Sequence, residues 1–373
     1  MNNPASGSGR TWQNNSTVAV STSGYQGWAM LDPWPLDEDP AATSTGLAIC
    51  PASDGQALRV SLRLAAPPAH SYLHLHTDSD LNVKPSLLAA DGALLLLHMT
   101  VSVVRNNPTF PSFETNFFVY KAHPEMAWLR LLPEFEDHCA SVGHTGIANK
   151  DDDDYVVAGF RVKMLTRDEC ATWDDEDEED GYREVGELSR FSSSTDRWDL
   201  VELPIPFDPD KGLFKFVWDS DDLFALDGFM FWVDYHRGML YCDVFAESPS
   251  LRFIQLPGIR VWGQDQNYSN GRQLPRAYRT VGVCRGAVKF VDIDDGFFGT
   301  RKTSGFRITT WSLNMADLVW VKDSVVEVDD LWLQPEFQDS TLPRWAPEFP
   351  VVNKQDGDLL HCILRGPELL AKT

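Results

Sequence analysis

Positive charge is scarce in this chain, and its absence excludes two classes of partner. The 373 residues include 32 Lys and Arg against 55 Asp and Glu, so the formal net charge is −23. Nucleic acids and anionic membrane surfaces would repel such a protein before any specific contact formed. The apolar stretch Ala93 to Leu97 is far shorter than the ~20 residues of a membrane-spanning helix. We therefore expect a soluble protein with neither nucleic acid nor membrane as its partner.

The N-terminal segment also lacks the features of a targeting sequence. Residues 1–26 are rich in Ser, Thr, Asn and Gly, and contain neither the apolar stretch of a signal peptide nor an Arg-rich transit helix. We predict a flexible polar tail over residues 1–26 and a cytoplasmic or nuclear location. In that setting we expect reduced thiols rather than disulfides. The six cysteines are widely spread: Cys50, Cys139, Cys170, Cys242, Cys284 and Cys362.

Motifs that carry known chemistry are missing. There is no Cys-x-x-Cys, His-Glu-x-x-His, dinucleotide fingerprint, phosphate loop or Gly-x-Ser-x-Gly elbow. His74 and His76 fall on one face of an apolar strand, but no third ligand can be named, so satisfied histidines are the favoured interpretation. The run from Asp292 to Gly296 departs from a calcium loop, and its Asp-Gly favours a turn. We expect no metal, no cofactor and no catalytic residue, and the binding residues stay unknown.

Short runs rich in Val, Phe, Tyr and Leu are abundant, and they alternate with clusters of Gly, Pro and Asp. This pattern indicates strands and turns, whereas helical periodicity is almost absent. We predict an all-β fold. Two acidic tracts interrupt the strands, at Asp151 to Asp154 and within residues 168–182. The second is interpreted as a solvated loop, with a docking patch for a basic partner as the alternative.

A strand, a polar turn and a second strand form a repeated element, and three of its four copies end in Leu-Pro. The copies span residues 118–133, 191–204, 244–257 and 308–322, and the last lacks the proline. Units of this size favour a β-propeller with irregular blades of antiparallel strands, with a large β-sandwich as the alternative. We predict a single propeller-like domain over residues 27–373.

A second repeated element is a turn glycine before an apolar strand, at Gly92, Gly238, Gly286 and Gly357. Arg237 and Arg285 precede two of these glycines. We predict that Arg237-Gly238 and Arg285-Gly286 occupy equivalent turns of neighbouring blades, with each glycine at positive φ.

Four tryptophans have two possible roles, because such side chains can fill a core or line a sugar site. Core packing is the favoured interpretation for Trp at recurring blade positions. The four are Trp198, Trp262, Trp311 and Trp320.

The chain resembles the large plant family, expanded in grasses, that is called domain of unknown function 1618. The motifs that carry the resemblance run from Trp232 to Phe245, Leu251 to Pro257, Val283 to Asp292 and Thr309 to Leu313, within a most family-specific region at 229–328. The hairpin repeat is also similar to F-box-associated and kelch-like propellers, which present partner-binding surfaces. The first 45 residues have no Leu-rich pattern of an F-box.

The resemblance implies kinship without a mechanism, so function rests on the pattern and the charge. We expect a non-enzymatic protein-interaction module whose partner is another protein with a basic face. The alternative is a hydrolase of the glycosidase type, with a pair of carboxylates in a propeller channel. Oligomeric state is left open.

Overall fold

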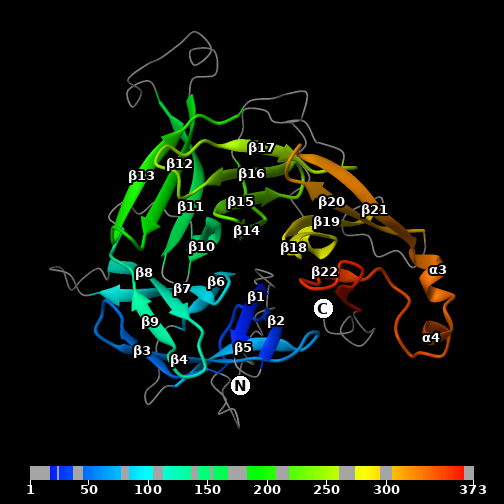
Figure 1. Cartoon of the computed structure of the whole chain (residues 1–373), viewed down its shortest axis with the longest axis horizontal. Coiled ribbons are helices and arrows are strands. Elements are labelled where there is room, and N and C mark those ends of the chain that lie inside the picture. Colours follow the sequence, from blue (N-terminus) through cyan, green and yellow to red (C-terminus); the bar gives the residue numbers. More distant parts are fainter. Residues whose placement is uncertain are drawn as a thin grey trace, which may run out of the picture. The chain divides into compact units, whose positions relative to one another are not determined.

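The computed structural model of the chain is built almost entirely of β-strands (Figure 1), which confirms the all-β prediction. It describes residues 17–22, 25–36, 45–76, 84–103, 112–135, 142–151, 154–166, 183–206, 218–259, 274–294 and 305–364. The predicted acidic loop at 168–182 and Trp262 lie outside these ranges. The described residues form two compact units, residues 1–132 and 133–373, and each is described by itself. The prediction of a single domain over 27–373 stays a prediction.

Unit 1 contains two sheets. The five-stranded sheet has the order β1-β2-β5-β4-β3, and its β2 and β5 are parallel while the other neighbours are antiparallel. The four-stranded sheet is the antiparallel meander β6-β7-β8-β9. The strands are β1 (Thr17–Thr22), β2 (Tyr25–Leu31), β3 (Ala48–Pro51), β4 (Ala57–Arg63), β5 (His70–Leu75), β6 (Ser86–Asp91), β7 (Leu94–Val103), β8 (Ser112–Lys121) and β9 (Trp128–Leu131).

Strands β1 and β2 correct the predicted tail. Residues 17–26 belong largely to these two paired strands, so the polar segment ends earlier than residue 26. The composition of this segment concealed the strands, because backbone pairing needs no apolar side chain once a neighbouring strand is in place.

Unit 2 contains three four-stranded antiparallel meanders and one two-stranded sheet. The first two meanders are β10 (Thr145–Asp151), β11 (Asp154–Leu165), β12 (Arg183–Ser192) and β13 (Arg197–Leu203), then β14 (Asp222–Leu226), β15 (Phe229–Asp234), β16 (Gly238–Asp243) and β17 (Arg252–Gln255). The third is β18 (Arg279–Cys284), β19 (Ala287–Asp294), β20 (Arg307–Asn314) and β21 (Val319–Glu327). Short helices α3 (Val328–Trp332) and α4 (Pro335–Gln338) precede β22 (Glu348–Val352) and β23 (Leu360–Ile363).

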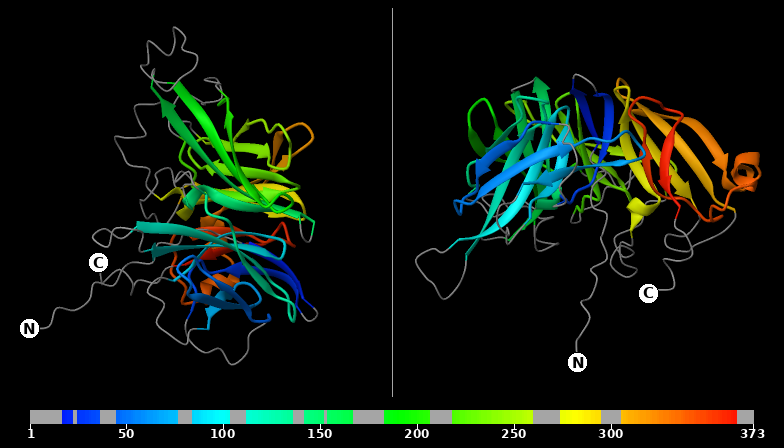
Figure 2. Two further views of the ribbon diagram at one scale, coloured as in Figure 1. Left: turned by 90° about the vertical axis from the view of Figure 1, so that its left-hand side faces the viewer. Right: turned by 90° about the horizontal axis from the view of Figure 1, so that it is seen from below.

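The first strand of each sheet in unit 2 contacts the first strand of the next: β10 lies against β14, β14 against β18, and β18 against β22. The further views show β22 beside β18 as well (Figure 2). Blades of a propeller follow one another in this way. The described strands form six separate sheets, which two facing sheets of a sandwich do not match. Closure into a ring stays a prediction.

The predicted hairpin repeat coincides with a structural repeat. All four copies lie at the third and fourth strands of a meander: β8 and β9, β12 and β13, β16 and β17, and β20 and β21. The repeat was visible in the sequence because both strands and their turn are close together in the chain.

Aromatic side chains fill the space between neighbouring sheets of unit 2. Phe231, Tyr241, Phe290 and Trp311 belong to one buried cluster contributed by the β14–β17 and β18–β21 sheets. The rings of Phe231 and Tyr241 stack at 5.2 Å between centroids, and those of Phe290 and Trp311 at the same separation. Such stacked pairs add to the stabilisation from apolar burial.

Candidate functional site

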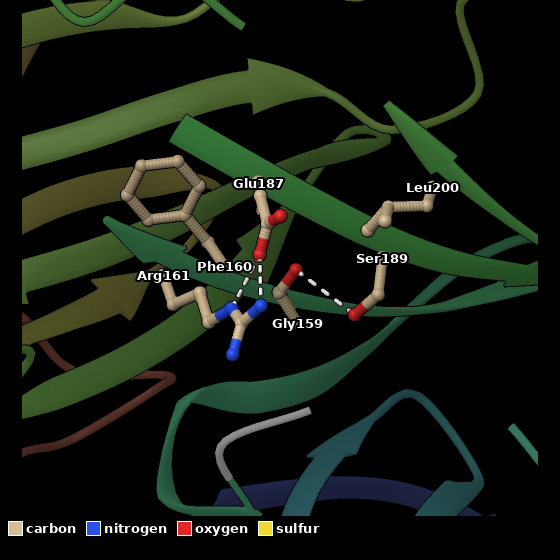
Figure 3. Close-up of a pocket in the computed structure, with 6 residues that line it drawn as sticks. All are labelled: Gly159, Phe160, Arg161, Glu187, Ser189 and Leu200. Carbon is tan, nitrogen blue, oxygen red and sulfur yellow. Dashed lines mark hydrogen bonds and ion pairs between the residues drawn. The ribbon is translucent and has the colours of Figure 1, made fainter. Parts of the chain in front are cut away.

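A small cavity lies on the β10–β13 sheet (Figure 3). Gly159, Phe160 and Arg161 of β11 line it together with Glu187 and Ser189 of β12 and Leu200 of β13. Its volume is about 10 Å³, which is room for a single water molecule and far too little for a sugar ring.

The one carboxylate of this cavity is bound to its neighbours. Arg161 and Glu187 stand directly opposite each other in β11 and β12, and Arg161 Nε donates to Glu187 Oε2 at 2.5 Å. Lys163 Nζ lies 3.6 Å from the other carboxylate oxygen. Only 4% of the Glu187 side chain is exposed, so the two cations offset the cost of burying its charge. The arrangement is a cross-strand ion pair and provides no second carboxylate for hydrolysis.

The largest group of buried polar side chains is the turn between β15 and β16, which we call the 234–237 turn. Asp234, Tyr235, His236 and Arg237 are all buried, although the turn connects two strands. Asp234 Oδ1 accepts from the backbone N–H of His236 at 2.8 Å, and Asp234 Oδ2 accepts from Arg237 Nη1 at 2.5 Å. One carboxylate thus closes the turn and neutralises the buried guanidinium.

Tyr235 connects the 234–237 turn to both neighbouring inner strands. Its backbone N–H donates to Asp221 Oδ2 at 2.8 Å, and its hydroxyl donates to Asp222 Oδ2 at 3.0 Å. The same hydroxyl accepts from the N–H of Val281 in β18 at 3.1 Å. Burial, and after it the negative charge of Asp222, raises the pKa of Tyr235 well above its usual value. The hydroxyl therefore stays protonated and holds β18 against the β14–β17 sheet.

Arg279 completes this network. Its Nη1 donates to the carbonyl of Tyr235 at 2.6 Å, and its Nε donates to Asp292 Oδ1 at 2.7 Å. Arg279 and Asp292 are opposite residues of β18 and β19. Asp292 thus serves as an ion-pair partner, while the turn predicted at Asp295 and Gly296 lies outside the described residues.

The two histidines singled out in the sequence lie together in unit 1. The rings of His74 and His76 meet edge to face, 4.3 Å between centroids. His74 is buried in β5, and His76 Nε2 lies 2.8 Å from Ser61 Oγ. In the part of the chain that the structure describes, no group of three His, Cys, Asp or Glu side chains is placed to hold a metal ion.

The tryptophans that the structure describes pack against protein. Trp311 is buried and Trp320 packs against the same cluster. Trp320 Nε1 donates to the carbonyl of Gln255 at 2.8 Å, and Trp198 Nε1 donates to the carbonyl of Pro133 at 2.8 Å. Each occupies the second position of a fourth strand, in β21 and β13. Their indoles hold neighbouring segments together rather than lining a cavity.

The cysteines within the described ranges, Cys50, Cys242, Cys284 and Cys362, are free thiols. Burial raises the pKa of Cys242 to about 12, and the nearby carboxylate of Asp243 raises it further. Burial also raises the pKa of Cys362 to about 12. Both thiols are protonated at neutral pH and are poor nucleophiles.

The two Arg-Gly turns are not equivalent, and this part of the repeat prediction was wrong. Arg237-Gly238 joins the second and third strands of its sheet, whereas Arg285-Gly286 joins the first and second. Gly286 has a φ of +78°, as predicted, but the φ of Gly238 is not positive. A Cβ on Gly238 would lie 2.3 Å from the carbonyl oxygen of Ile254, so close approach of β17 requires the glycine.

The equivalent of Arg285-Gly286 is Asp227-Gly228, between β14 and β15. Both residues of each pair have positive φ: 50° and 82° for Asp227 and Gly228, and 50° and 78° for Arg285 and Gly286. Two-residue hairpin loops with two positive φ values match the twist of the strands that they join. Residue identity at the first position misled the sequence comparison, because Asp and Arg do the same backbone work in these loops.

The most exposed apolar segment of unit 2 is the edge formed by residues 318–327, which we call the β21 edge. β21 is the last strand of its sheet, and among the described strands it pairs only with β20. Its apolar side chains are between 39% and 55% exposed: Leu318, Val319, Val321, Val325 and Val326. The apolar pattern of this strand gave no sign of its exposure, because a buried strand has the same composition.

A bulge divides the β21 edge. Thr310 pairs with Ser324 and Trp311 with Lys322, so Asp323 has no opposite residue in β20. Asp323 Oδ2 accepts from Ser312 Oγ at 2.7 Å and from Lys289 Nζ at 3.0 Å. The carboxylate is thereby fixed to the sheet, and the bulge separates the edge into two short pairing segments.

The surroundings of the β21 edge are acidic. Residues 315–333 contain five acids, Asp317, Asp323, Glu327, Asp329 and Asp330, and one base, Lys322, which gives 1 − 5 = −4. Both helices that follow the strand are short, and none of the described helices is long and apolar enough to cross a membrane.

Comparison with known proteins confirms the predicted resemblance over the second half of the chain. Residues 232–361 match the model of the family described as protein of unknown function DUF1618. The match begins at the 234–237 turn and includes the β21 edge, and it overlaps most of the 229–328 region singled out in the sequence. No curated protein matches the chain.

Among solved structures, the chain is similar to one described as the complex structure of the fission yeast SREBP-SCAP binding domains. The identity is 12%, the alignment covers 98% of this chain and 93% of the other, and the TM-score is 0.35. At that score the likeness is not used for fold or function.

Proposed function

We propose that this DUF1618-type chain is a protein-interaction module that binds a partner protein carrying a basic face. The observation that carries the proposal is the β21 edge, where exposed apolar side chains stand among acidic residues. Apolar area gives a partner something to bury, and the surrounding charge selects the sign of the partner. The whole chain, with its net charge of −23, attracts the same class of partner from a distance.

The buried polar groups support this division of labour. Asp234, Asp222 and Asp292 each bind a named group of the fold, and Glu187 is held by Arg161 and Lys163. These acids stabilise unit 2 and are not aimed into a cavity that could hold a substrate. The hydrolase alternative would need two facing carboxylates in a pocket, and the described cavity offers one carboxylate and room for one water.

We further propose that the meanders are blades of a propeller. The support is their common strand order and the contacts between successive first strands of unit 2. Propeller blades present their outermost strands at the rim, which suits an edge that binds partners.

Affinity capture at two ionic strengths tests the proposed function. The tagged full chain is incubated with cell extract at about 0.05 M and about 1 M salt, where exposed charges are weakly and strongly screened. We expect a discrete set of basic proteins at low salt and much less of it at high salt. A tagged acidic protein of similar net charge is the control for non-specific attraction. The proposal is wrong if this control captures the same proteins, or if neither salt concentration yields any.

A further inference from the structure

We propose that the β21 edge binds its partner by strand addition, and that the occupant is an extended segment with apolar residues at alternate positions and Lys or Arg at its ends. This inference rests on the proposed function and specifies how that site would work. Edge strands direct alternate N–H and C=O groups outward, and an extended peptide can satisfy them.

The length of β21 favours it over the other outer strands of unit 2. It spans nine residues, whereas β13 spans seven and β17 four. β13 also carries Arg197, Asp199 and Glu202, and the charge of Asp199 is bound by Arg190 at 2.8 Å. Charged side chains on an edge strand discourage pairing, and β21 has fewer of them.

The side chains of β21 specify what the added strand presents. Val319 and Val321 stand opposite Asn314 and Ser312, so they project from one face of the sheet. Trp320 and Lys322 stand opposite Leu313 and Trp311 on the other face, and Lys322 Nζ lies 5.9 Å from the Trp311 ring centroid. An added strand with apolar residues beside Val319 and Val321 would extend the exposed valine row across the sheet edge.

Charge specifies the ends of the occupant. Asp317 lies just before β21, and Glu327, Asp329 and Asp330 lie at its end, all exposed. Lysines at both ends of a bound segment would therefore approach carboxylates. A second copy of this chain is disfavoured as occupant, because two edges of net charge −4 repel each other.

The bulge limits the length of the segment that binds. Asp323 interrupts the register between Lys322 and Ser324, so an added strand would pair with residues 318–322 or with residues 324–327. The first of these two segments contains Val319 and Val321, which have the highest exposure of the edge, 52% and 55%. We assign the docking position to residues 318–322.

A fluorescent peptide tests this inference directly. The probe alternates valine and threonine and has two lysines at each end, and its binding to the full chain is followed by fluorescence polarisation. One control peptide has N-methylated backbone amides at alternate positions, which removes strand pairing. A second has glutamates in place of the lysines. We expect binding of the probe alone, weakened by salt.

Two matched variants locate the site. Val321→Lys places a like charge beside the lysine-ended probe and removes apolar area, and we expect about tenfold or greater weakening. Leu200→Lys makes the same change at a 38% exposed position of β13, and we expect affinity within about twofold of the unmodified chain. Circular dichroism and thermal melts confirm that both variants are folded.

Four results would overturn the inference: no binding of the probe, equal binding of the N-methylated peptide, equal loss in both variants, or a dimer that Val321→Lys dissociates. The proposed function is tested separately, because capture of basic proteins at low salt by both the unmodified chain and Val321→Lys would retain an interaction module and reject this edge.

Discussion

The β14–β17 and β18–β21 sheets have the same strand order but expose their hairpins differently. The β15–β16 hairpin with its 234–237 turn is buried, and its polar groups bind one another. The β20–β21 hairpin ends in a strand whose described residues, apart from Trp320, are exposed. The comparison teaches that the most distinctive family motif maintains the fold, while the less distinctive strand has the surface that a partner can reach.

The largest expected effect breaks the buried hairpin at Gly238. In Gly238→Ala the new Cβ would lie 2.3 Å from the carbonyl oxygen of Ile254 and 2.5 Å from the Phe253 ring, so β16 and β17 must separate. We expect a loss of about 4 kcal/mol or more in the free energy of unfolding, measured by urea denaturation. A loss below about 1 kcal/mol would show that the two strands accommodate a methyl group.

The next effect concerns the buried ion pair of the same turn. Asp234→Asn keeps an oxygen for the N–H of His236 but leaves the guanidinium of Arg237 buried without its carboxylate. We expect a loss of about 3 kcal/mol in urea denaturation. The double variant Asp234→Asn, Arg237→Met removes the uncompensated charge and should regain about 1 kcal/mol or more. An equally unstable double variant would contradict this explanation.

Gly286 sharpens the comparison, because the same substitution meets open space there. Nothing lies within 4 Å of a Cβ on Gly286, and only the φ of +78° opposes a side chain. We expect Gly286→Ala to cost about 1 to 2 kcal/mol and Gly286→Asn less, since Asn tolerates this conformation. Thermal melts of the three glycine variants should therefore rank Gly238→Ala lowest. Equal shifts for Gly238→Ala and Gly286→Ala would restore the equivalence that the sequence predicted.

Alkaline pH offers a smaller test of the Tyr235 network. The folded pKa of Tyr235 is raised above the ordinary value of about 10, so its contribution to stability is fully present below pH 10 and is lost as the pH rises toward the folded pKa. We expect the free energy of unfolding to fall by about 1.4 kcal/mol for each pH unit in that window for this tyrosine. Urea denaturation of Tyr235→Phe should show a shallower decline, although this variant is less stable at neutral pH. An unchanged slope would remove Tyr235 from the account.

The sequence predicted what depends on neighbouring residues and missed what depends on distant ones. Each outer hairpin was visible because strand, turn and strand follow within the chain, as in 244–257. The 234–237 turn was recorded as a family motif, but its burial depends on Asp221, Val281 and Arg279 from other strands. A signal was present, since four polar residues between two apolar strands are unusual for a solvated loop that lacks Gly or Pro at its centre.

The candidate surface was the least predictable part. Val319 and Val321 read as core residues, and their exposure follows from the position of β21 as the last strand of its sheet. Strand order within a sheet is a tertiary property that alternation and composition do not encode. The acidic character of the partner-binding surface, by contrast, was expected from the net charge.

Hydrogen exchange of the backbone amides, with and without the lysine-ended probe, tests the central claim most directly. Slowed exchange confined to residues 318–322 is the result that strand addition predicts, because new hydrogen bonds would protect the outward N–H groups of β21. The amides of β13 should exchange at an unchanged rate and serve as the internal control. Protection of β13 to the same degree, or bound probe with no protection at β21, would contradict the account.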